Sequence, residues 1–415
     1  MTTNKNHNSP NVPNSTDKGN VIRNVPALRF PEFEGEWKKE QLGDTADFSK
    51  GAGISKEQLS EKGEPCILYG ELYTKYKSEV IYDIISKTDI DSTKLVRSQA
   101  NDVIIPSSGE TAEDIATARC VLKNNILLGG DLNIIRLHNH SGSFMSYQLN
   151  GKRKYDIAKV AQGVSVVHLY AEHLKGVNTY NPCMEEQEKI ARLLSLLDER
   201  IATQNKIIED LKKLKSAIID YAIDSLDANF MKFGYLYETA GEGGTPTTSN
   251  ASFYDNGKIP FIKIDDLKKK YLVENNDFIT ELGLQKSSAW LVPTQSILFS
   301  NGATIGEITI TTYPVCTKQG ILGIVPKSNI DVEFLYYFMS SSYFKKAISR
   351  IVTEGTMKTA YLKDINNIRC PIPTKEKQQE IAKIPSAINS KIDFEQSILR
   401  LFYAQKQYLL RQMFI

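Results

Sequence analysis

Hydrophobic residues recur at alternating spacings of four and three in a long stretch near the middle of the chain. Such a spacing keeps one apolar seam on a helix for more than four heptads, as in a coiled coil. The pattern predicts a long helix over residues 185–226. The seam positions are Ile190, Leu194, Leu197, Ile201, Gln204, Ile208, Leu211, Lys215, Ile218 and Ala222.

The same seam returns 191 positions later and predicts a second long helix over 374–415. Polar residues interrupt both seams at matching places, Gln204 with Glu395 and Lys215 with Lys406, and such interruptions specify alignment. A proline inside a helix removes a hydrogen bond and clashes with the preceding turn, so Pro385 predicts a kink or a helix that begins near it. The second seam reads Ile381, Pro385, Ile388, Ile392, Glu395, Leu399, Phe402, Lys406, Leu409 and Met413.

The two helices belong to an internal repeat that covers most of the chain. Residues 170–201 return as 361–392, and in the joint before each helix Pro182 matches Pro373 and Gln187 matches Gln378. Further upstream, residues 42–46 align with 236–240. Duplication of this kind predicts two similar folded units, which we place at residues 25–184 and 227–373.

Each unit should have an α+β fold, because short β-branched or aromatic runs alternate with Gly, Ser, Thr and Asn loops and with helical patches. The first helix leaves one unit and the second must return, so the pair should pack as an antiparallel coiled coil with pseudo-two-fold symmetry. A helix of ~35 residues spans roughly 50 Å, more than the ~34 Å between two sites one turn apart on duplex DNA. The alternative is that the seams pair with a second chain.

Composition adds few constraints. The 415 residues include 24% charged residues and a formal net charge of +2, so any nucleic-acid surface must be local. The five cysteines show no C-x-x-C spacing, which is typical of a reducing compartment. Residues 1–24 are rich in Asn, Ser, Thr and Pro and predict a disordered tail, and no apolar run is long enough for a membrane span. We expect a cytoplasmic protein.

The chain resembles the DNA specificity subunits of type I restriction-modification systems. The resemblance covers nearly everything after the tail and rests on the order of repeated motifs: the opening 28–33, the Pro-x-x-Glu-x-Gln-x-x-Ile joint at 182–190, and the Gly-Gly-Thr-Pro turn at 243–246. It implies that each unit is a target recognition domain that reads one half of an asymmetric DNA target. The helix pair would fix the gap between the halves.

The resemblance also implies partners. Two modification subunits would methylate adenine N6 with S-adenosylmethionine, and two restriction subunits would cleave DNA with ATP and Mg. This chain would bind no cofactor of its own. It would determine the DNA target and would catalyse no reaction.

The motifs in the chain agree with a non-catalytic role. No D/N-P-P-Y/F segment and no G-x-x-x-x-G-K-[ST] loop is present, and the nearest approach to the first, residues 181–184, lacks the second proline and the aromatic residue. Residues 265–268 resemble part of a nuclease site, but their counterpart 70–73 lacks the lysine. Histidines 138, 140, 168 and 173 have no cysteine or carboxylate at ligand spacing. We therefore expect no catalytic residues and no metal.

DNA readers need cations for phosphates and polar side chains for base edges. For each lysine named here, taken individually, a solvated surface position is the commoner explanation. The candidates in the first unit are Lys50, Lys75, Lys77, Lys152, Arg153 and Lys154 for phosphates, and Ser107, Ser108, Gln162 and Ser165 for bases. Those in the second unit are Lys268, Lys269, Lys270, Lys318, Lys345, Lys346 and Lys358 for phosphates, and Thr245, Thr247, Asn301, Gln319 and Thr356 for bases.

Two other functions compete with this one. A coiled-coil scaffold with two protein-binding units is favoured slightly by the low net charge. An autonomous nuclease or methyltransferase is disfavoured by the missing motifs. Because the candidate loops of the two repeats differ in residue type, a DNA target should be non-palindromic.

Overall fold

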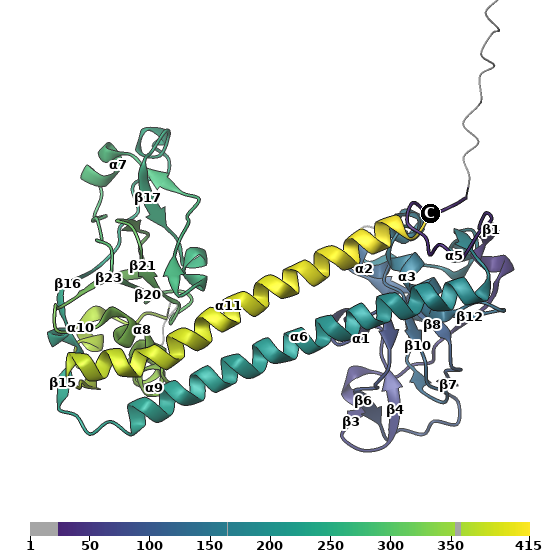
Figure 1. The fold of residues 1–415 in the computed structure, drawn as a ribbon, viewed down its shortest axis with the longest axis horizontal. Helices are drawn as coiled ribbons and strands as arrows, with labels where there is room; N and C mark the ends of the chain where they lie inside the picture. The colour runs from purple at the N-terminus through teal and green to yellow at the C-terminus, as the bar shows by residue number, and fades with distance from the viewer. Residues whose placement is uncertain (1–23, 164, 353–357) are drawn as a thin grey trace, which may run out of the picture. The chain divides into compact units, whose positions relative to one another are not determined.

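A computed structural model describes residues 24–163, 165–352 and 358–415. The chain forms two compact units: unit 1 holds the chain up to Ala202 together with Arg400–Ile415, and unit 2 holds Thr203–Leu399. The expected disordered tail lies outside the described residues except for Asn24. Figure 1 shows strands gathered in each unit and two long helices.

Unit 1 is built on a five-stranded main sheet in the order β2-β12-β8-β10-β5. All neighbours are antiparallel except β10 and β5. A second five-stranded sheet has the order β3-β6-β4-β11-β7, and β1 pairs with β14. The strands are β1 (Lys38–Gln41), β2 (Ala46–Lys50), β3 (Leu59–Ser60), β4 (Glu64–Ile67), β5 (Val80–Ile81), β6 (Ser86–Thr88), β7 (Val96–Arg97), β8 (Asp102–Pro106), β9 (Ser108–Gly109), β10 (Arg119–Val121), β11 (Leu127–Leu128), β12 (Leu132–Leu137), β13 (Val167–His168) and β14 (Asn178–Asn181).

Helices cover one face of this sheet. The short helices of unit 1 are α1 (Glu71–Thr74), α2 (Ala112–Ile115), α3 (Gly142–Asn150), α4 (Lys154–Val160) and α5 (Ala171–Lys175). The middle strand β8 is buried along its whole length, which explains its continuous apolar run. Val103 and Ile105 face a core with α3 and α4, while Ile104 faces a second core beneath the other sheet.

Unit 2 repeats this plan with the main-sheet order β16-β23-β20-β21-β18, again with one parallel pair, at β18 and β21. Its second sheet, β19-β17-β22, has three strands instead of five. The elements are β15 (Phe230–Lys232), β16 (Tyr237–Glu242), β17 (Ile259–Ile262), β18 (Tyr271–Leu272), β19 (Phe278–Ile279), β20 (Ile297–Ser300), β21 (Ile308–Thr311), β22 (Cys316–Thr317), β23 (Ile321–Pro326), β24 (Arg369–Pro371), α7 (Glu281–Gln285), α8 (Val332–Ser340), α9 (Ser342–Ile351) and α10 (Leu362–Ile365).

The structure corrects one part of the repeat alignment. The match of Leu42 with Leu236 is wrong by three residues, because Leu42 corresponds to Phe233. Each of these two residues begins a 3-10 turn, η1 (Leu42–Asp44) or η3 (Phe233–Tyr235). Each donates its N–H to the carbonyl of the residue just before the strand that leads into a long helix, Val177 or Ile368. Equivalent residues of the two repeats are therefore 191 positions apart both here and at the long helices. The loop insertions that change this offset lie between these two points.

The two long helices are α6 (Met184–Asp224) and α11 (Lys375–Gln412), and they pack antiparallel within each unit. In unit 1, Ile190 and Leu194 of α6 share a core with Leu410 near the end of α11. In unit 2, Gln204 donates a hydrogen bond to the Glu395 carbonyl at 3.1 Å, and Lys215 binds Asn389 at 2.8 Å. Later residues of α6 thus meet earlier residues of α11, as predicted, and the seams are covered within the chain.

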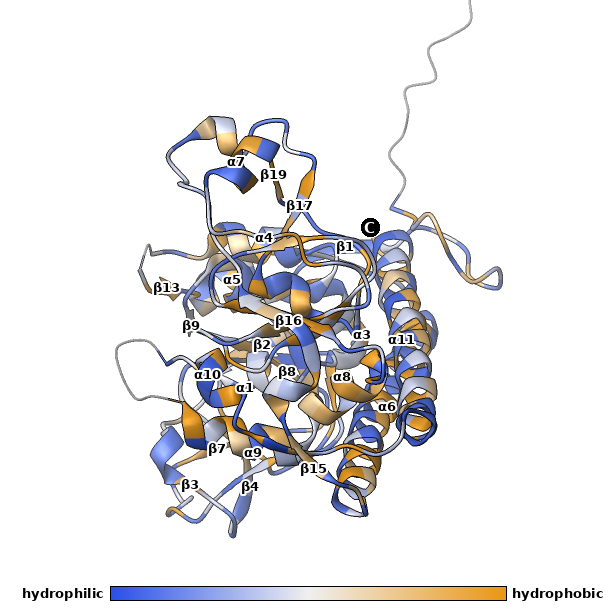
Figure 2. Cartoon of the chain, turned by 90° about the vertical axis from the view of Figure 1, so that its left-hand side faces the viewer, coloured by the Kyte–Doolittle hydropathy of each residue, from blue (hydrophilic) through white to orange (hydrophobic). Residues whose placement is uncertain are grey.

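Pro385 lies inside α11, which begins ten residues earlier at Lys375. The expectation that the helix begins near the proline is therefore wrong, and Figure 1 shows α11 as one continuous ribbon. Pro385 is buried. Figure 2 shows hydrophobic positions recurring between hydrophilic ones along both long helices. Among the described residues, no helix is long and apolar enough to cross a membrane.

The repeated joint has a structural role that is the same in both units. The Gln187 side chain accepts from the Ser141 N–H at 3.0 Å and donates to the Pro182 carbonyl at 2.9 Å. Gln378 does the same with Asp331 and Pro373. Ser141 and Asp331 are the N-caps of α3 and α8, so this glutamine ties the start of each long helix to the helix that covers the sheet.

Both ends of the described chain contribute to unit 1. Leu28 donates its N–H to the Gln412 carbonyl at 2.9 Å, and Arg29 forms an ion pair with Glu186 at 2.7 Å. Trp37 packs edge-on against Phe144 and Phe414. The last residues of the chain are therefore part of the core of unit 1.

Candidate nucleic-acid interface

In unit 1 the structure brings together loops that are more than fifty residues apart in sequence. Val167 and His168 pair with Gly109 and Ser108 as β13 and β9. Gln162 and His168 exchange backbone hydrogen bonds of 2.9 and 2.7 Å. Three predicted readers, Ser107, Ser108 and Gln162, thus lie in one loop cluster at the end of β8, with Ser165 exposed beside them. Ser107 is buried and lies beneath the cluster.

Unit 2 forms the same cluster at the end of β20. Gly302 bridges to Thr359, and Ala360 donates its N–H to the Asn301 carbonyl at 2.8 Å. The Gln319 N–H lies 3.4 Å from the Thr245 hydroxyl, and Thr247 is exposed. Thr356 lies outside the described residues. Three of the predicted readers of the second unit, Thr245, Asn301 and Gln319, thus lie in one loop cluster.

Asn301 is positioned differently from the exposed readers. It is 1% exposed, and its side-chain amide donates to the Ala360 carbonyl at 3.3 Å. In this conformation Asn301 holds the loop cluster together and does not face solvent.

The glycines before Thr245 are explained by packing. A Cβ on Gly243 would lie 2.2 Å from the Thr317 carbonyl oxygen, and one on Gly244 would lie 2.4 Å from the Ala289 nitrogen. Gly51 occupies the corresponding place in unit 1, where a Cβ would lie 1.9 Å from the Gly129 oxygen. The chain crosses another segment at this point, and only glycine permits the approach.

Three of the predicted phosphate contacts are engaged inside their units. Lys75 binds Glu71 and Ser86, each at 2.6 Å. Arg153 donates to the Ile415 carbonyl at 2.9 Å and lies over the Tyr180 ring. Lys270 is buried and binds Glu333 at 2.9 Å and Ser386 at 2.8 Å. These side chains have structural partners in the absence of DNA.

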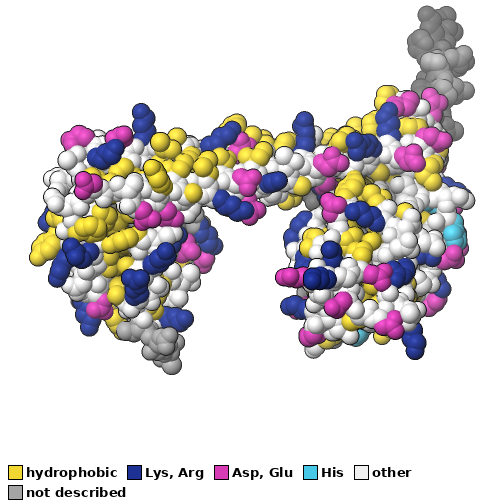
Figure 3. All heavy atoms as spheres, turned by 90° about the horizontal axis from the view of Figure 1, so that it is seen from below, with side chains coloured by type: hydrophobic (Ala, Val, Ile, Leu, Met, Phe, Trp, Pro, Cys, Tyr) yellow, Lys and Arg dark blue, Asp and Glu magenta, His cyan; other side chains and the backbone are white. Residues whose placement is uncertain are grey.

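The other predicted cations lie at the surface. Lys268 and Lys269 are exposed but paired, with Asp265 at 2.9 Å and Glu274 at 3.1 Å. Lys77 is exposed and donates to the Tyr73 carbonyl at 2.6 Å. Lys154 is partly exposed, and those fully exposed are Lys50, Lys152, Lys318, Lys345, Lys346 and Lys358. Figure 3 shows Lys and Arg side chains interspersed with Asp and Glu over the visible face of each unit, which agrees with a small net charge.

Sequence reasoning missed several residues of the loop clusters. His168 joins both loops of unit 1, and its ring stacks with Tyr170 at 6.2 Å between centroids. Tyr361, the repeat equivalent of Tyr170, has Lys363 over its ring at 5.5 Å. Both tyrosines are nearly half exposed. Tyr170 and Tyr361 are 191 positions apart, which is the offset of the repeat. This equivalence was the sequence signal that could have identified them.

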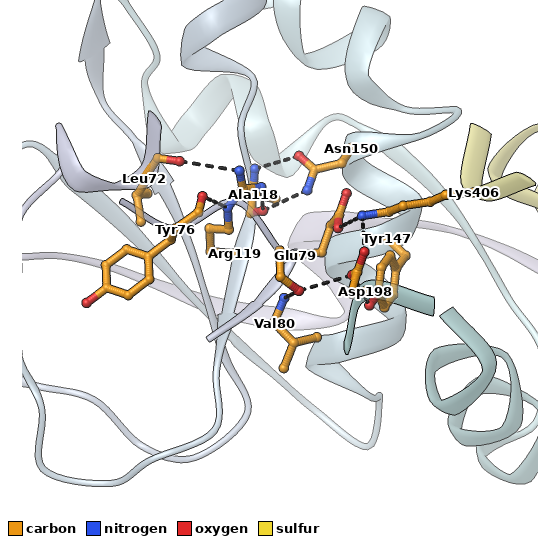
Figure 4. A network of polar contacts seen from close by, with 11 residues as sticks. Leu72, Tyr76, Glu79, Val80, Ala118, Arg119, Tyr147, Asn150, Asp198 and Lys406 are labelled. Atoms are coloured by element: carbon orange, nitrogen blue, oxygen red, sulfur yellow. Dashed lines mark hydrogen bonds and ion pairs between the residues drawn. The ribbon is translucent and has the colours of Figure 1, made fainter. Parts of the chain in front are cut away.

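A buried ionic cluster of unit 1 lies where α11 meets the sheet (Figure 4). Lys406 forms ion pairs with Glu79 and Asp198, and Tyr147 donates to Asp198 at 2.7 Å. We call these four residues the anchor cluster. Burial raises the pKa of Glu79 against the opposing effect of Lys406. Burial alone would lower the pKa of Lys406, but attraction from Glu79 and Asp198 outweighs it and the pKa is raised.

Perturbed pKa values can mark catalytic sites, but the anchor cluster is buried and its groups satisfy one another. Its role is to attach α11. Within the part of the chain that the structure describes, no group of three or more His, Cys, Asp or Glu residues could hold a metal ion.

Comparisons with known proteins agree with this arrangement. The chain is 26% identical over 285 residues to the MjaIX type I restriction enzyme specificity subunit of Methanocaldococcus jannaschii, a match that covers 63% of this chain and 66% of that protein, just under two thirds. It is 23% identical over 401 residues to the putative MjaX specificity subunit of the same organism, covering 90% and 91%.

A solved structure shares the fold. The type I restriction-modification S subunit of M. genitalium superposes with a TM-score of 0.60 at 18% identity, covering 94% of this chain and 99% of that one. The family described as type I restriction modification DNA specificity domain matches residues 34–213 and again residues 227–401. Each match takes in one repeat and most of the following long helix, so the chain belongs to the type I restriction-modification DNA specificity family.

Proposed function

We propose that the chain reads a bipartite, asymmetric DNA target, one half with each unit, and is not itself an enzyme. The observation that carries this proposal is the loop cluster, which is built by the same strand ends in both units but from different residues. Ser108, Gln162 and His168 line it in unit 1, and Gly302, Gln319 and Thr359 in unit 2. Equivalent clusters with unlike side chains favour two unlike half-sites.

The proposal includes partners. The relatives are named as specificity subunits of type I restriction enzymes, which supports assembly with modification and restriction subunits. S-adenosylmethionine, ATP and Mg would be used by those subunits, and extrusion of the target base would occur in the modification subunit. The role of this chain would be to position them at its target.

Exposed apolar residues on the long helices support a docking surface for a modification subunit. On α6 they are Ile207, Leu214 and Tyr221, and on α11 they are Phe394, Leu401 and Tyr408. Spacing of seven keeps each set on one face of its helix, separate from the buried seam. Figure 3 shows hydrophobic side chains along the exposed surface of the helices. A partner helix that packs on either set would cover it.

Sequencing of methylated DNA from a host that carries variant chains tests the reading role. The double substitution Ser108→Ala and Gln162→Ala removes polar groups from the unit 1 cluster, and we expect it to relax or change one half of the methylated motif only. Gln319→Ala should affect the other half. Each lost base contact should cost about 1–3 kcal/mol of discrimination.

Gln405→Ala, an exposed glutamine on α11, is the matched control and should leave both halves unchanged. Unaltered motifs in all variants would show that the loop clusters do not read bases. If the assembled complex also lacked salt-sensitive binding to duplex DNA, the scaffold alternative would be favoured instead.

A further inference from the structure

Helix α9 forms a ridge between two cavities of unit 2. Phe344 and Ile348 are buried beneath it. On one side, Lys346, Arg350 and Arg369 line a cavity of about 460 Å³. On the other side, Lys345 and Lys358 line a more apolar cavity of about 340 Å³. The ridge therefore presents cations to both sides.

Carboxylates also line the first cavity. Asp224 and Asp364 are both present there, so its three cations are only partly balanced. The lining of the second cavity includes no carboxylate among the described residues. The ridge as a whole has an excess of positive charge.

Helix α4 is the equivalent of α9 in unit 1. Buried Ile157 corresponds to buried Ile348 at an offset of 191. At the same offset Lys154 corresponds to Lys345, and Lys159 corresponds to Arg350. The intervening exposed positions differ, since Tyr155 faces solvent where unit 2 has Lys346. Both helices thus carry two cations five residues apart, although the exposed residues between these cations differ.

The described residues give these four cations no ion pair. Of the residues that the structure describes, none places a carboxylate within 4 Å of Lys154, Lys159, Lys345 or Arg350. Other surface lysines do have such partners, as Lys175 has Glu172 at 2.7 Å and Lys377 has Glu380 at 2.9 Å. A cation without a carboxylate partner can pair with a phosphate without first breaking an ion pair.

In the chain, each helix precedes residues of a loop cluster. After α4, the chain reaches Gln162 and His168, and after α9 it reaches Lys358 and Thr359. In a protein–DNA interface, phosphate contacts beside the reading residues fix the register of the protein on the duplex. The position of the cation pairs beside the clusters fits that role.

We propose that α4 and α9 hold the DNA backbone beside each half-site and that Lys159 and Arg350 are phosphate contacts, together with Lys154 and Lys345. This inference rests on the proposed function and deepens it. Lys159 and Arg350 were not among the sequence-derived candidates, and the geometry now places them next to residues that were.

Binding of the purified full-length chain to a 30-base-pair duplex of arbitrary sequence, measured over a range of salt concentrations, tests the proposal. The variants are Lys154→Gln with Lys159→Gln and Lys345→Gln with Arg350→Gln. Each pair should weaken binding at all sequences and lower the slope of log affinity against log salt by about 1.8, the effect of losing two phosphate contacts. Arg350→Lys keeps the charge and should retain most of the slope.

The control is Lys206→Gln with Lys383→Gln, two exposed lysines on α6 and α11 of unit 2, which should leave the slope unchanged. If both test pairs show the same slope as the wild type, this inference is overturned and the proposed function remains intact. A wild-type chain with no salt-dependent binding would contradict both. An equal loss in the control pair would show a general charge effect and would also overturn the inference.

Discussion

Lys406 links α11 to unit 1 through two ion pairs. It is buried and has two carboxylate partners, Glu79 and Asp198. Its repeat equivalent Lys215 meets a neutral partner, Asn389, at 2.8 Å. A buried ion pair adds little net stability relative to an apolar replacement of both partners, but removal of one partner leaves an uncompensated charge. Substitution of the lysine alone should therefore be costly.

We expect Lys406→Met to destabilise unit 1 by roughly 3–5 kcal/mol at pH 8. The folded state raises the pKa of Glu79 above its ordinary 4.5, so the stability from this group is present below pH 4.5 and declines as pH rises through the folded pKa. Without Lys406 the pKa of Glu79 should rise further. The loss of stability caused by Lys406→Met should therefore be smaller at pH 5 than at pH 8. The raised pKa of Lys406 keeps it charged at both pH values.

Unfolding in urea at pH 5 and pH 8, followed by tryptophan fluorescence, measures this effect. The chain has two tryptophans, Trp37 and Trp290, so a Trp290→Phe background leaves Trp37 as the reporter of unit 1. Lys383→Met, exposed on the same helix, is the control and should change stability by less than about 0.5 kcal/mol. If Lys406→Met lowers the free energy of unfolding equally at both pH values, protonation of Glu79 does not govern the loss.

The exposed stripe of α6 and α11 gives a prediction at the scale of elements. Leu214→Glu with Tyr221→Glu, and Phe394→Glu with Leu401→Glu, change residues that are 50% to 77% exposed. The isolated chain should therefore keep its stability and become more soluble. Recovery of the modification subunit in co-purification should fall at least about tenfold, the effect of a 1.4 kcal/mol loss. Lys206→Glu is the control and should not change recovery of the modification subunit. If that recovery is undiminished for both double variants, the modification subunit docks elsewhere.

Much of this architecture at the element scale follows from sequence patterns. The four-three spacing predicted both long helices, and residues of both seams are buried, among them Ile190, Ile208 and Ile392. The repeated Gln187 and Gln378 marked a joint whose hydrogen bonds are indeed the same. The antiparallel arrangement followed from connectivity. Periodicity and repetition report local geometry, which explains why these predictions succeeded.

Site residues were harder to predict because burial depends on the tertiary fold. Lys270 stands in a run of three lysines, yet it lies immediately before the edge strand β18 and turns inward to Glu333. Asn301 looked like a base reader, but its side chain holds a neighbouring loop. Lys159 and Arg350 were missed because each is one cation among many, and only the alignment of α4 with α9 makes them a pair.

The whole molecule would act as a ruler if the helix pair sets the gap between half-sites. Insertion of seven residues into α6 near Gln204 and seven into α11 near Glu395 keeps both seams in register. The added rise is roughly 10 Å, so the unread gap in the methylated motif should lengthen by about three base pairs. Sequencing of methylated DNA measures it.

The control for the ruler is the same insertion in α6 alone. That change shifts one seam against the other and should abolish methylation instead of lengthening the gap. Retention of the original gap with both insertions would contradict the ruler, even if the loop clusters prove to read bases.

The location of Phe414 beside Trp37 has a consequence for biosynthesis. A ribosome adds Leu410, Met413 and Phe414 after every residue of unit 2, and these side chains complete the core that contains Trp37, Phe144 and Ile190. The domain made first therefore cannot finish folding until unit 2 and these later residues have been synthesised. A chain that stopped before Leu410 would leave the aromatic surface of Trp37 and Phe144 uncovered, a state prone to aggregation.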